Sequence, residues 1–208
     1  IAHGIVIFPG GAGTVEEILY LLAILGDSRN ARDPLPVILT GPTSSIPTIE
    51  AYVEFLTLTL GADAVSQMTI IIGDPVGVAE HIQRGRDDVK NYRLSTNDSY
   101  YFNWMMHIPS TLLSPFDPTH ESMSALQLDK DQQPQNLACE LRRLFSGIVA
   151  GNVKPEVRRS IDSQGPFEIK AEPHLVAAID QLLSRLINEK RMKMDGDYRP
   201  CYKIISTR

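Results

Sequence analysis

Apolar residues alternate between two spacings along the first half of the chain. Short runs rich in β-branched residues predict buried parallel strands, and apolar residues spaced three and four apart predict amphipathic helices. The predicted strands are 5–8, 35–39 and 69–72, and the predicted helices are 14–25, 49–60 and about 76–92. This alternation predicts an α/β domain over residues 1–93, the second part of a Rossmann-like doubly wound parallel sheet. We expect its earlier strands upstream of Ile1.

The pattern changes after a polar stretch, Arg93 to Ser99, which we predict to be a linker. Residues 99–108 are aromatic and strand-like, and three prolines interrupt residues 109–118. Helices are predicted at 134–153, 155–163 and 175–192, with short strands at 167–170 and 201–206. Residues 94–208 are therefore expected to form a smaller, mainly helical α+β domain. Small residues at 146–152 indicate close helix packing.

The first predicted strand leads into a glycine turn, Pro9 to Gly13, and Thr14 is positioned to begin a helix. Backbone amides at a helix start are unpaired and lie at the positive end of the helix dipole. We therefore expect the amides of Gly11 to Thr14 to be free to bind an anion. The predicted phosphate-binding residues are Gly10, Gly11, Ala12, Gly13 and Thr14.

Two carboxylates, Glu16 and Glu17, follow the turn, where a simple phosphate site would favour a basic residue. Two interpretations of Glu17 remain open. It has the spacing of a capping box with Thr14, which would make it structural. Alternatively, it acts on the group to which the phosphate is attached. The glycines are followed neither by the Gly-Lys-Ser/Thr of a Walker A loop nor by the third glycine of a dinucleotide fingerprint.

Further candidates lie in the second half. His120 and Glu121 follow Thr119, and they fit site residues, a metal pair or a plain helix N-terminus capped by Thr119. The metal interpretation is the weakest because no third ligand has matching spacing. Arg142 lies beside the apolar face of the helix predicted at 134–153. Arg29, in the polar loop after the first helix, fits either a phosphate ligand or a solvated side chain.

Composition narrows the function classes. The 208 residues are 43% hydrophobic and 22% charged, which suits a globular protein with a real core. The net charge of −5 and the lack of a basic block argue against long nucleic acid as a partner. No apolar run reaches the roughly 18 residues of a membrane span. Cys139 and Cys201 have no metal-like spacing. We expect a cytoplasmic protein that uses neither a metal nor another cofactor.

The stretch Pro9 to Glu17 resembles the signature of the LOG family, Pro-Gly-Gly-x-Gly-Thr-x-x-Glu, at every fixed position. The family consists of nucleotide 5′-monophosphate phosphoribohydrolases that were once labelled lysine decarboxylases. The resemblance implies that the glycine turn holds the 5′-phosphate and that Glu17 acts at the ribosyl centre. A pyridoxal phosphate decarboxylase would need a Schiff-base lysine. Residues 1–99 contain only Lys90, in a predicted charged helix far from the turn.

Residues 102–104, 115–121, 142–154 and 200–202 resemble the C-terminal domain of one bacterial branch of this family. That branch comprises the pyrimidine/purine nucleotide 5′-monophosphate nucleosidases. The resemblance implies a homo-oligomer regulated by the alarmone (p)ppGpp. It also implies upstream strands and an upstream Arg-Lys pair that the printed sequence does not contain.

The sequence thus predicts a hydrolase that cleaves the N-glycosidic bond of nucleoside 5′-monophosphates such as AMP, GMP, CMP and UMP. Glu17 is the predicted catalytic carboxylate, and Glu16 is expected to support it or to face outward. His120, Glu121 and Arg142 are further candidates for lining the site. The alternative is a non-catalytic nucleotide-binding or sensor module in which Glu17 only caps a helix.

Overall fold

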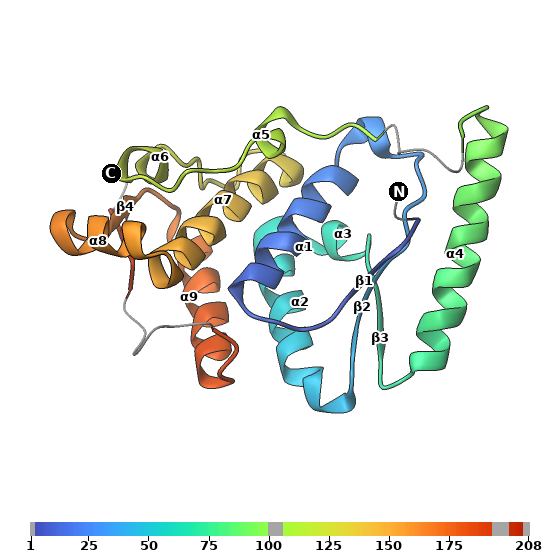
Figure 1. The fold of residues 1–208 in the computed structure, drawn as a ribbon, viewed down its shortest axis with the longest axis horizontal. Helices are drawn as coiled ribbons and strands as arrows, with labels where there is room; N and C mark the ends of the chain where they lie inside the picture. The colour runs from blue at the N-terminus through green and yellow to red at the C-terminus, as the bar shows by residue number, and fades with distance from the viewer. Residues whose placement is uncertain (1–2, 100–105, 193–199, 206–208) are drawn as a thin grey trace.

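The computed structural model describes residues 3–99, 106–192 and 200–205. In its first half, strands and helices alternate along the chain (Figure 1). The elements there are β1 (Ile5–Ile7), α1 (Ala12–Leu25), η1 (Ser28–Asn30), β2 (Val37–Gly41), η2 (Thr43–Ser45), α2 (Ile46–Leu60), α3 (Ala62–Val65), β3 (Thr69–Ile72) and α4 (Pro75–Ser95).

The second half is mainly helical. Its elements are α5 (Ser110–Leu113), α6 (His120–Ser124), α7 (Pro134–Val153), α8 (Pro155–Gln164), β4 (Phe167–Ile169), α9 (Pro173–Asn188) and β5 (Tyr202–Ile204). The predicted strand at 99–108 falls mostly on residues 100–105, which lie outside the described residues together with the motif at 102–104. Within the residues that the structure describes, every helix is too short or too polar to span a bilayer.

The three strands of the first half form one parallel sheet in the order β1-β2-β3. Val6 pairs with Ile38, and Leu39 pairs with Ile70. Helices α1 and α2 lie on one side of this sheet, and α4 lies on the other (Figure 1). The central strand β2 is buried at every position because it has a strand on each edge and helices over both faces. The predicted α/β architecture with parallel strands is therefore confirmed.

Strand β1 differs from its prediction. The sequence predicted a buried run from Ile5 to Phe8, but Val6 is 37% exposed and Phe8 is 64% exposed. In the described residues, β1 is an edge strand that pairs only with β2, so its outer side is uncovered. A continuous apolar run predicts full burial only where neighbouring elements cover both sides of the strand.

The predicted linker at Arg93 to Ser99 is partly wrong, because α4 continues to Ser95. Arg93 is fully buried, and its Nε donates a hydrogen bond to Asp98 at 2.8 Å. A buried arginine requires such a partner. The interaction holds the end of α4 in place, where the polar sequence had suggested a loop.

The two halves share one hydrophobic core. Helix α1 packs along α7 over a longer contact than any other pair of elements in the described chain. Phe55 of α2 and Phe145 of α7 also meet edge to face, with ring centroids 5.6 Å apart. The buried residues of both halves form one continuous cluster. The glycine turn therefore lies at the start of a helix that packs between the sheet and the second half.

The second half contains its own small sheet, in which β4 and β5 pair in parallel and α9 connects them. Helix α7 has the predicted bounds. A Cβ atom on Gly147 would lie 2.4 Å from the sulfur of Met123, so the predicted close packing at the small residues is confirmed there. Helix α9 ends at Asn188, four residues earlier than predicted, because Lys190 adopts a left-handed conformation with a φ of 57°.

Candidate functional site

The glycine turn connects β1 to α1, as predicted, but the helix begins earlier. The first helical residue is Ala12 and the N-cap is Gly11, with no side-chain capping hydrogen bond. The amide of Thr14 already donates to the carbonyl of Gly11 at 3.0 Å, inside the first turn. The capping-box interpretation of Thr14 and Glu17 is therefore wrong. Such a box occurs instead at Thr119, whose hydroxyl accepts from the amide of Ser122.

Within the described residues, three amides of the turn have no hydrogen-bond partner. The amide of Gly10 donates to the hydroxyl of Tyr52 at 3.0 Å, and the amide of Thr14 is used within the helix. In the described part of the chain, the amides of Gly11, Ala12 and Gly13 have no hydrogen-bond acceptor. The expectation of free amides is thus wrong for Thr14, while three donors stay available at the positive end of α1.

Two of the three glycines at the turn, Gly10 and Gly11, have close neighbours where a side chain would begin. A Cβ atom on Gly10 would lie 2.1 Å from the hydroxyl of Thr14. A Cβ atom on Gly11 would lie 2.0 Å from the carbonyl oxygen of Arg191, which follows α9. The backbone of Arg191 therefore excludes a side chain at Gly11, and a side chain at Gly10 would require the Thr14 side chain to move.

Glu16 and Glu17 lie on different sides of α1, because successive residues of a helix point in different directions. Glu17 is four residues after Gly13, so the two residues share one face of α1, and both are exposed. No described residue forms a hydrogen bond or an ion pair with Glu17. Glu16 is four residues after the buried Ala12 and lies on the side that faces α7. Among the described residues, the Glu17 side chain is thus exposed and lies one helical turn after the glycine turn.

Glu16 is held against α7 by Arg142. The Arg142 Nε atom lies 3.4 Å from Glu16 Oε1, and only 21% of the Glu16 side chain is exposed. Burial raises the pKa of the Glu16 carboxyl, and it outweighs the opposing effects of Arg142 and a hydrogen bond from Ser146. Glu16 supports the packing of the helix that carries Glu17.

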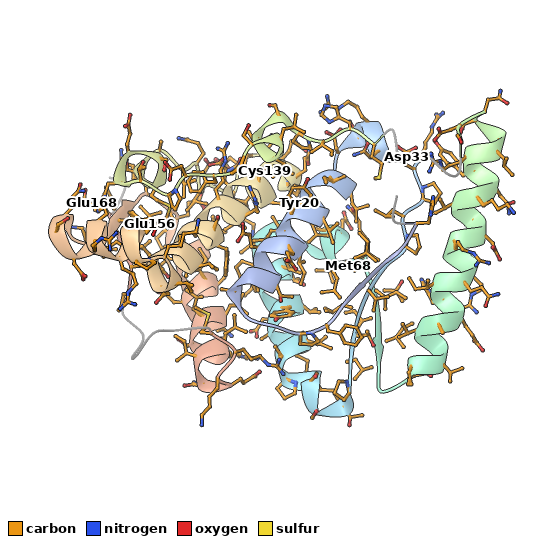
Figure 2. All side chains as sticks on the ribbon, viewed as in Figure 1. Tyr20, Asp33, Met68, Cys139, Glu156 and Glu168 are labelled. Atoms are coloured by element: carbon orange, nitrogen blue, oxygen red, sulfur yellow. The ribbon has the colours of Figure 1, made fainter. Side chains whose placement is uncertain are left out.

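Arg142 is the predicted second-half residue that the structure brings to α1. Its guanidinium lies 5.7 Å from the ring centroid of Tyr20, which lies between α1 and α7 (Figure 2). Among the described residues, its buried Nε and Nη1 atoms have no hydrogen-bond acceptor. The guanidinium is thus held by the ion pair with Glu16 and by the aromatic face of Tyr20.

His120 and Glu121 have other surroundings. The Nε2 atom of His120 donates to the carbonyl of Gly165 at 2.8 Å, and its ring packs edge to face on Phe167. Glu121 is exposed in the first turn of α6. No contact in the described residues joins either side chain to the glycine turn. In that part of the chain, no three His, Cys, Asp or Glu side chains gather so that they could hold a metal ion.

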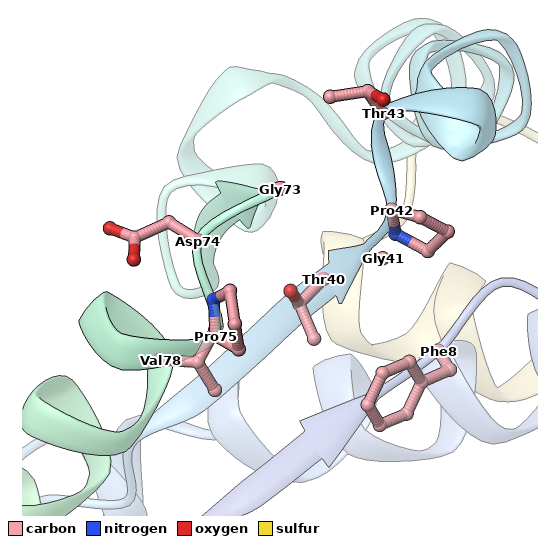
Figure 3. Close-up of a pocket in the computed structure, with 9 residues that line it drawn as sticks. All are labelled: Phe8, Thr40, Gly41, Pro42, Thr43, Gly73, Asp74, Pro75 and Val78. Atoms are coloured by element: carbon pink, nitrogen blue, oxygen red, sulfur yellow. The ribbon is translucent and has the colours of Figure 1, made fainter.

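A pocket of about 470 Å³ opens beside the turn, at the carboxyl ends of the three strands (Figure 3). Phe8 lines it after β1, Thr40 and Thr43 line it around the end of β2, and Asp74 lines it after β3. Ligands bind at this edge of open parallel sheets. The pocket is mainly apolar with a few polar groups, as is usual for small-molecule sites. Asp74 also caps α4 by accepting a hydrogen bond from the amide of Gly77.

The sequence pattern missed two residues of the site. Tyr52 lies in the helix predicted at 49–60 and Arg191 in the helix predicted at 175–192, and the pattern singled out neither. Burial raises the pKa of Tyr52 to about 12, so its hydroxyl keeps the proton that it donates to the Gly10 carbonyl at 2.7 Å. The two residues contact the glycine turn from distant parts of the chain. A local pattern carries no signal for such contacts.

Comparisons with known proteins match both halves. Residues 1–82 match the family model "Possible lysine decarboxylase", and residues 86–205 match "Pyrimidine/purine nucleotide monophosphate nucleosidase, C-terminal". Three relatives named pyrimidine/purine nucleotide 5′-monophosphate nucleosidase, from Escherichia coli K12, CFT073 and O157:H7, are each 46% identical over 205 residues. The matched region covers 98% of this chain and 45% of each relative, so the chain spans less than half of their length.

Proposed function

The chain belongs to the pyrimidine/purine nucleotide monophosphate nucleosidase family, and we propose on that premise that the protein hydrolyses the N-glycosidic bond of nucleoside 5′-monophosphates. The products are a free base and ribose 5-phosphate. In the described part of the chain, the amides of Gly11 to Gly13 have no acceptor and the Glu17 carboxylate has no hydrogen-bond or ion-pair partner. Both groups belong to the first two turns of α1, and this combination carries the proposal.

The glycine turn anchors the 5′-phosphate. The three free amides donate to phosphate oxygens, and the dipole of α1 adds to the attraction. Substrate binding energy is thereby used at a distance from the bond that breaks, which orients the sugar. The hydroxyl of Thr14 lies in the same first turn and can donate as well.

Glu17 acts on the sugar. It follows Gly13 by four residues, which is about 6 Å along the helix axis. Its carboxylate stabilises the positive charge that develops as the N-glycosidic bond breaks, and it positions or deprotonates the attacking water. Glu16 contributes indirectly, because its ion pair with Arg142 fixes the helix that carries Glu17.

The test is base release from AMP, GMP, CMP and UMP by the full-length protein, measured by chromatography. Glu17→Gln should lower kcat by about 10²-fold or more, because general acid–base groups contribute about 10²–10⁴-fold. Thermal stability should be unchanged, because Glu17 is exposed and forms no hydrogen bond or ion pair in the described chain.

Glu156→Gln is the matched control, since Glu156 is an exposed helical glutamate on α8 (Figure 2). Its base release should equal that of the wild type. Undiminished base release by Glu17→Gln would overturn the assignment of Glu17. Nucleotide binding without any base release by the wild type would favour the sensor module instead.

The finer architecture and the assembly are part of the same proposal. Helices on both faces of the sheet support its interpretation as the second part of a Rossmann-like doubly wound fold, with domains at 1–93 and 94–208. A homo-oligomer and regulation by (p)ppGpp rest on the family resemblance. Light scattering and binding of the alarmone to the full-length protein test these two points.

A further inference from the structure

Tyr52 of α2 holds the glycine turn from one side. Its side chain is buried, and its hydroxyl both accepts from the amide of Gly10 at 3.0 Å and donates to the carbonyl of Gly10 at 2.7 Å. One hydroxyl thus satisfies both backbone groups of this residue. Any rotation of the Gly10 backbone away from α2 leaves buried polar groups without partners, which is unfavourable.

Arg191 holds the turn from the other side. Helix α9 ends in a Schellman motif, in which the amide of Arg191 donates to the carbonyl of Leu186 and Lys190 takes the left-handed conformation. This turn directs Arg191 toward the glycine turn, where its Nη1 donates to the carbonyl of Pro9 at 3.0 Å. The Arg191 carbonyl also packs against Gly11.

Glu189 connects these contacts. Its carboxylate accepts from Arg191 Nε at 3.1 Å and from the hydroxyl of Thr48 on α2. We call Thr48, Tyr52, Glu189 and Arg191 the turn clamp. Through it, α2 holds the peptide groups on both sides of Gly10, and the segment after α9 holds the one between Pro9 and Gly10.

The turn clamp determines which backbone groups face a ligand. Its donors engage the carbonyls of Pro9 and Gly10, so these partial negative charges are kept away from a bound anion. In the described residues, the amides of Gly11 to Gly13 have no acceptor and are successive at the start of α1. Successive amides of this kind can form an anion-binding concavity.

We propose that Tyr52 and Arg191 are positioning residues that hold the glycine turn in its phosphate-binding conformation. This inference rests on the proposed nucleosidase function. The clamp acts on phosphate binding and not on bond cleavage, because it touches the turn and not Glu17. When a smaller fraction of the protein has the turn in its phosphate-binding conformation, the apparent affinity for the nucleotide falls in proportion to that fraction. The value of kcat, measured at saturating nucleotide, is unchanged.

The experiment uses Tyr52→Phe and Arg191→Met in the full-length protein. We expect KM for AMP to rise about tenfold in each, which corresponds to about 1.4 kcal/mol, with kcat within about twofold. The inhibition constant of ribose 5-phosphate should rise by the same factor as KM. Because both variants loosen one turn, their effects should not add in the double variant.

Two control variants distinguish a specific effect on the glycine turn from a general loss of packing around α9. Arg185→Met breaks the ion pair of Arg185 with Glu54, which also joins α9 to α2. Tyr202→Phe removes a buried tyrosine hydroxyl that donates to Asp180 at 2.6 Å. In both, KM and the ribose 5-phosphate inhibition constant should stay within about twofold of the wild type.

The outcomes are distinct. Unchanged KM and unchanged ribose 5-phosphate inhibition in Tyr52→Phe and Arg191→Met would overturn the positioning role of the clamp. Equal rises in KM in the two control variants would overturn it as well, and so would a fall in kcat without a change in KM. A wild type that releases no base would overturn the proposed function, and direct calorimetry with ribose 5-phosphate would then still test the clamp. Arg191 is partly exposed, so its variant keeps the test decisive if Tyr52→Phe does not fold.

Discussion

Asp27 shows how one residue ties distant segments together. Its carboxylate accepts from Arg29 Nε at 2.8 Å and from Arg29 Nη2 at 2.6 Å, and it lies 3.0 Å from His107 Nδ1. The Arg29 hydrogen bonds hold the pKa of Asp27 well below its usual range, against the opposing effect of burial. Of the two roles open to Arg29, the structure favours a structural one: it anchors the loop after α1.

This ion pair predicts a pH-dependent stability. The folded pKa of Asp27 is below its unfolded value of about 3.9. The contribution of Asp27 to stability is therefore full above about pH 3.9, and it is lost progressively as the pH falls from there toward the folded pKa. Asp27→Asn should lower stability at pH 7 by about 1–2 kcal/mol. Thermal unfolding at pH 7, 5 and 3 checks this, and the gap to the wild type should narrow toward pH 3. A gap that is constant with pH would contradict the prediction.

At the scale of elements, the start of α1 shows tertiary contacts overriding a local preference. Threonine is a favoured N-cap, yet the helix begins after Gly11. Tyr52 and Arg191 fix the preceding peptides, so Thr14 is already inside the first turn. The motif residues therefore serve the geometry of the turn and not the capping of the helix.

Gly11 and Gly13 differ in their surroundings, and a pair of alanine substitutions tests this difference. Gly11→Ala should destabilise the protein by about 1–3 kcal/mol, because its Cβ would collide with the Arg191 carbonyl. Gly13→Ala meets no atom within 4 Å and should stabilise the helix by about 0.5 kcal/mol. Both are measured as unfolding midpoints in denaturant. Similar losses at the two positions would contradict this account of the turn.

Gly13→Ala also separates stability from binding. Glycine permits the close approach of a backbone to phosphate. If the phosphate binds at the predicted turn, this variant should be at least as stable as the wild type and still have a raised KM for nucleotides. An unchanged KM would place the phosphate elsewhere.

At the scale of the molecule, α1 is shared between the sheet and the second half. Its contact with α7 and the pairing of Phe55 with Phe145 join both halves into one core. The site therefore depends on the second half, although its motif lies in the first. Loss of packing in α7 should loosen the glycine turn.

Phe145→Ala tests this coupling. Removal of a fully buried phenylalanine costs about 3–5 kcal/mol, and hydrogen exchange should increase in peptides from both α1 and α7. Phe8→Ala is the control, because Phe8 is 64% exposed and its loss should leave exchange in both helices unchanged. Faster exchange in α7 alone would show that the halves unfold independently.

Local patterns in the sequence determined most elements and the family. Apolar residues at helical spacing predicted α7 with its observed bounds, and they predicted α2 and α4 to within a few residues of theirs. The motif from Pro9 to Glu17 identified the glycine turn as the candidate site. These features are local, since propensity, periodicity and turn chemistry act over a few residues.

The tertiary structure alone decided which groups surround that turn. Tyr52 meets Gly10 across 42 positions of sequence, and Arg191 meets Pro9 across 182. Packing also directed Glu16 to Arg142 and kept His120 beside Phe167, away from the predicted site. Such contacts depend on how whole elements pack, and the free energy of packing is a property of the assembled core that no short stretch of sequence contains.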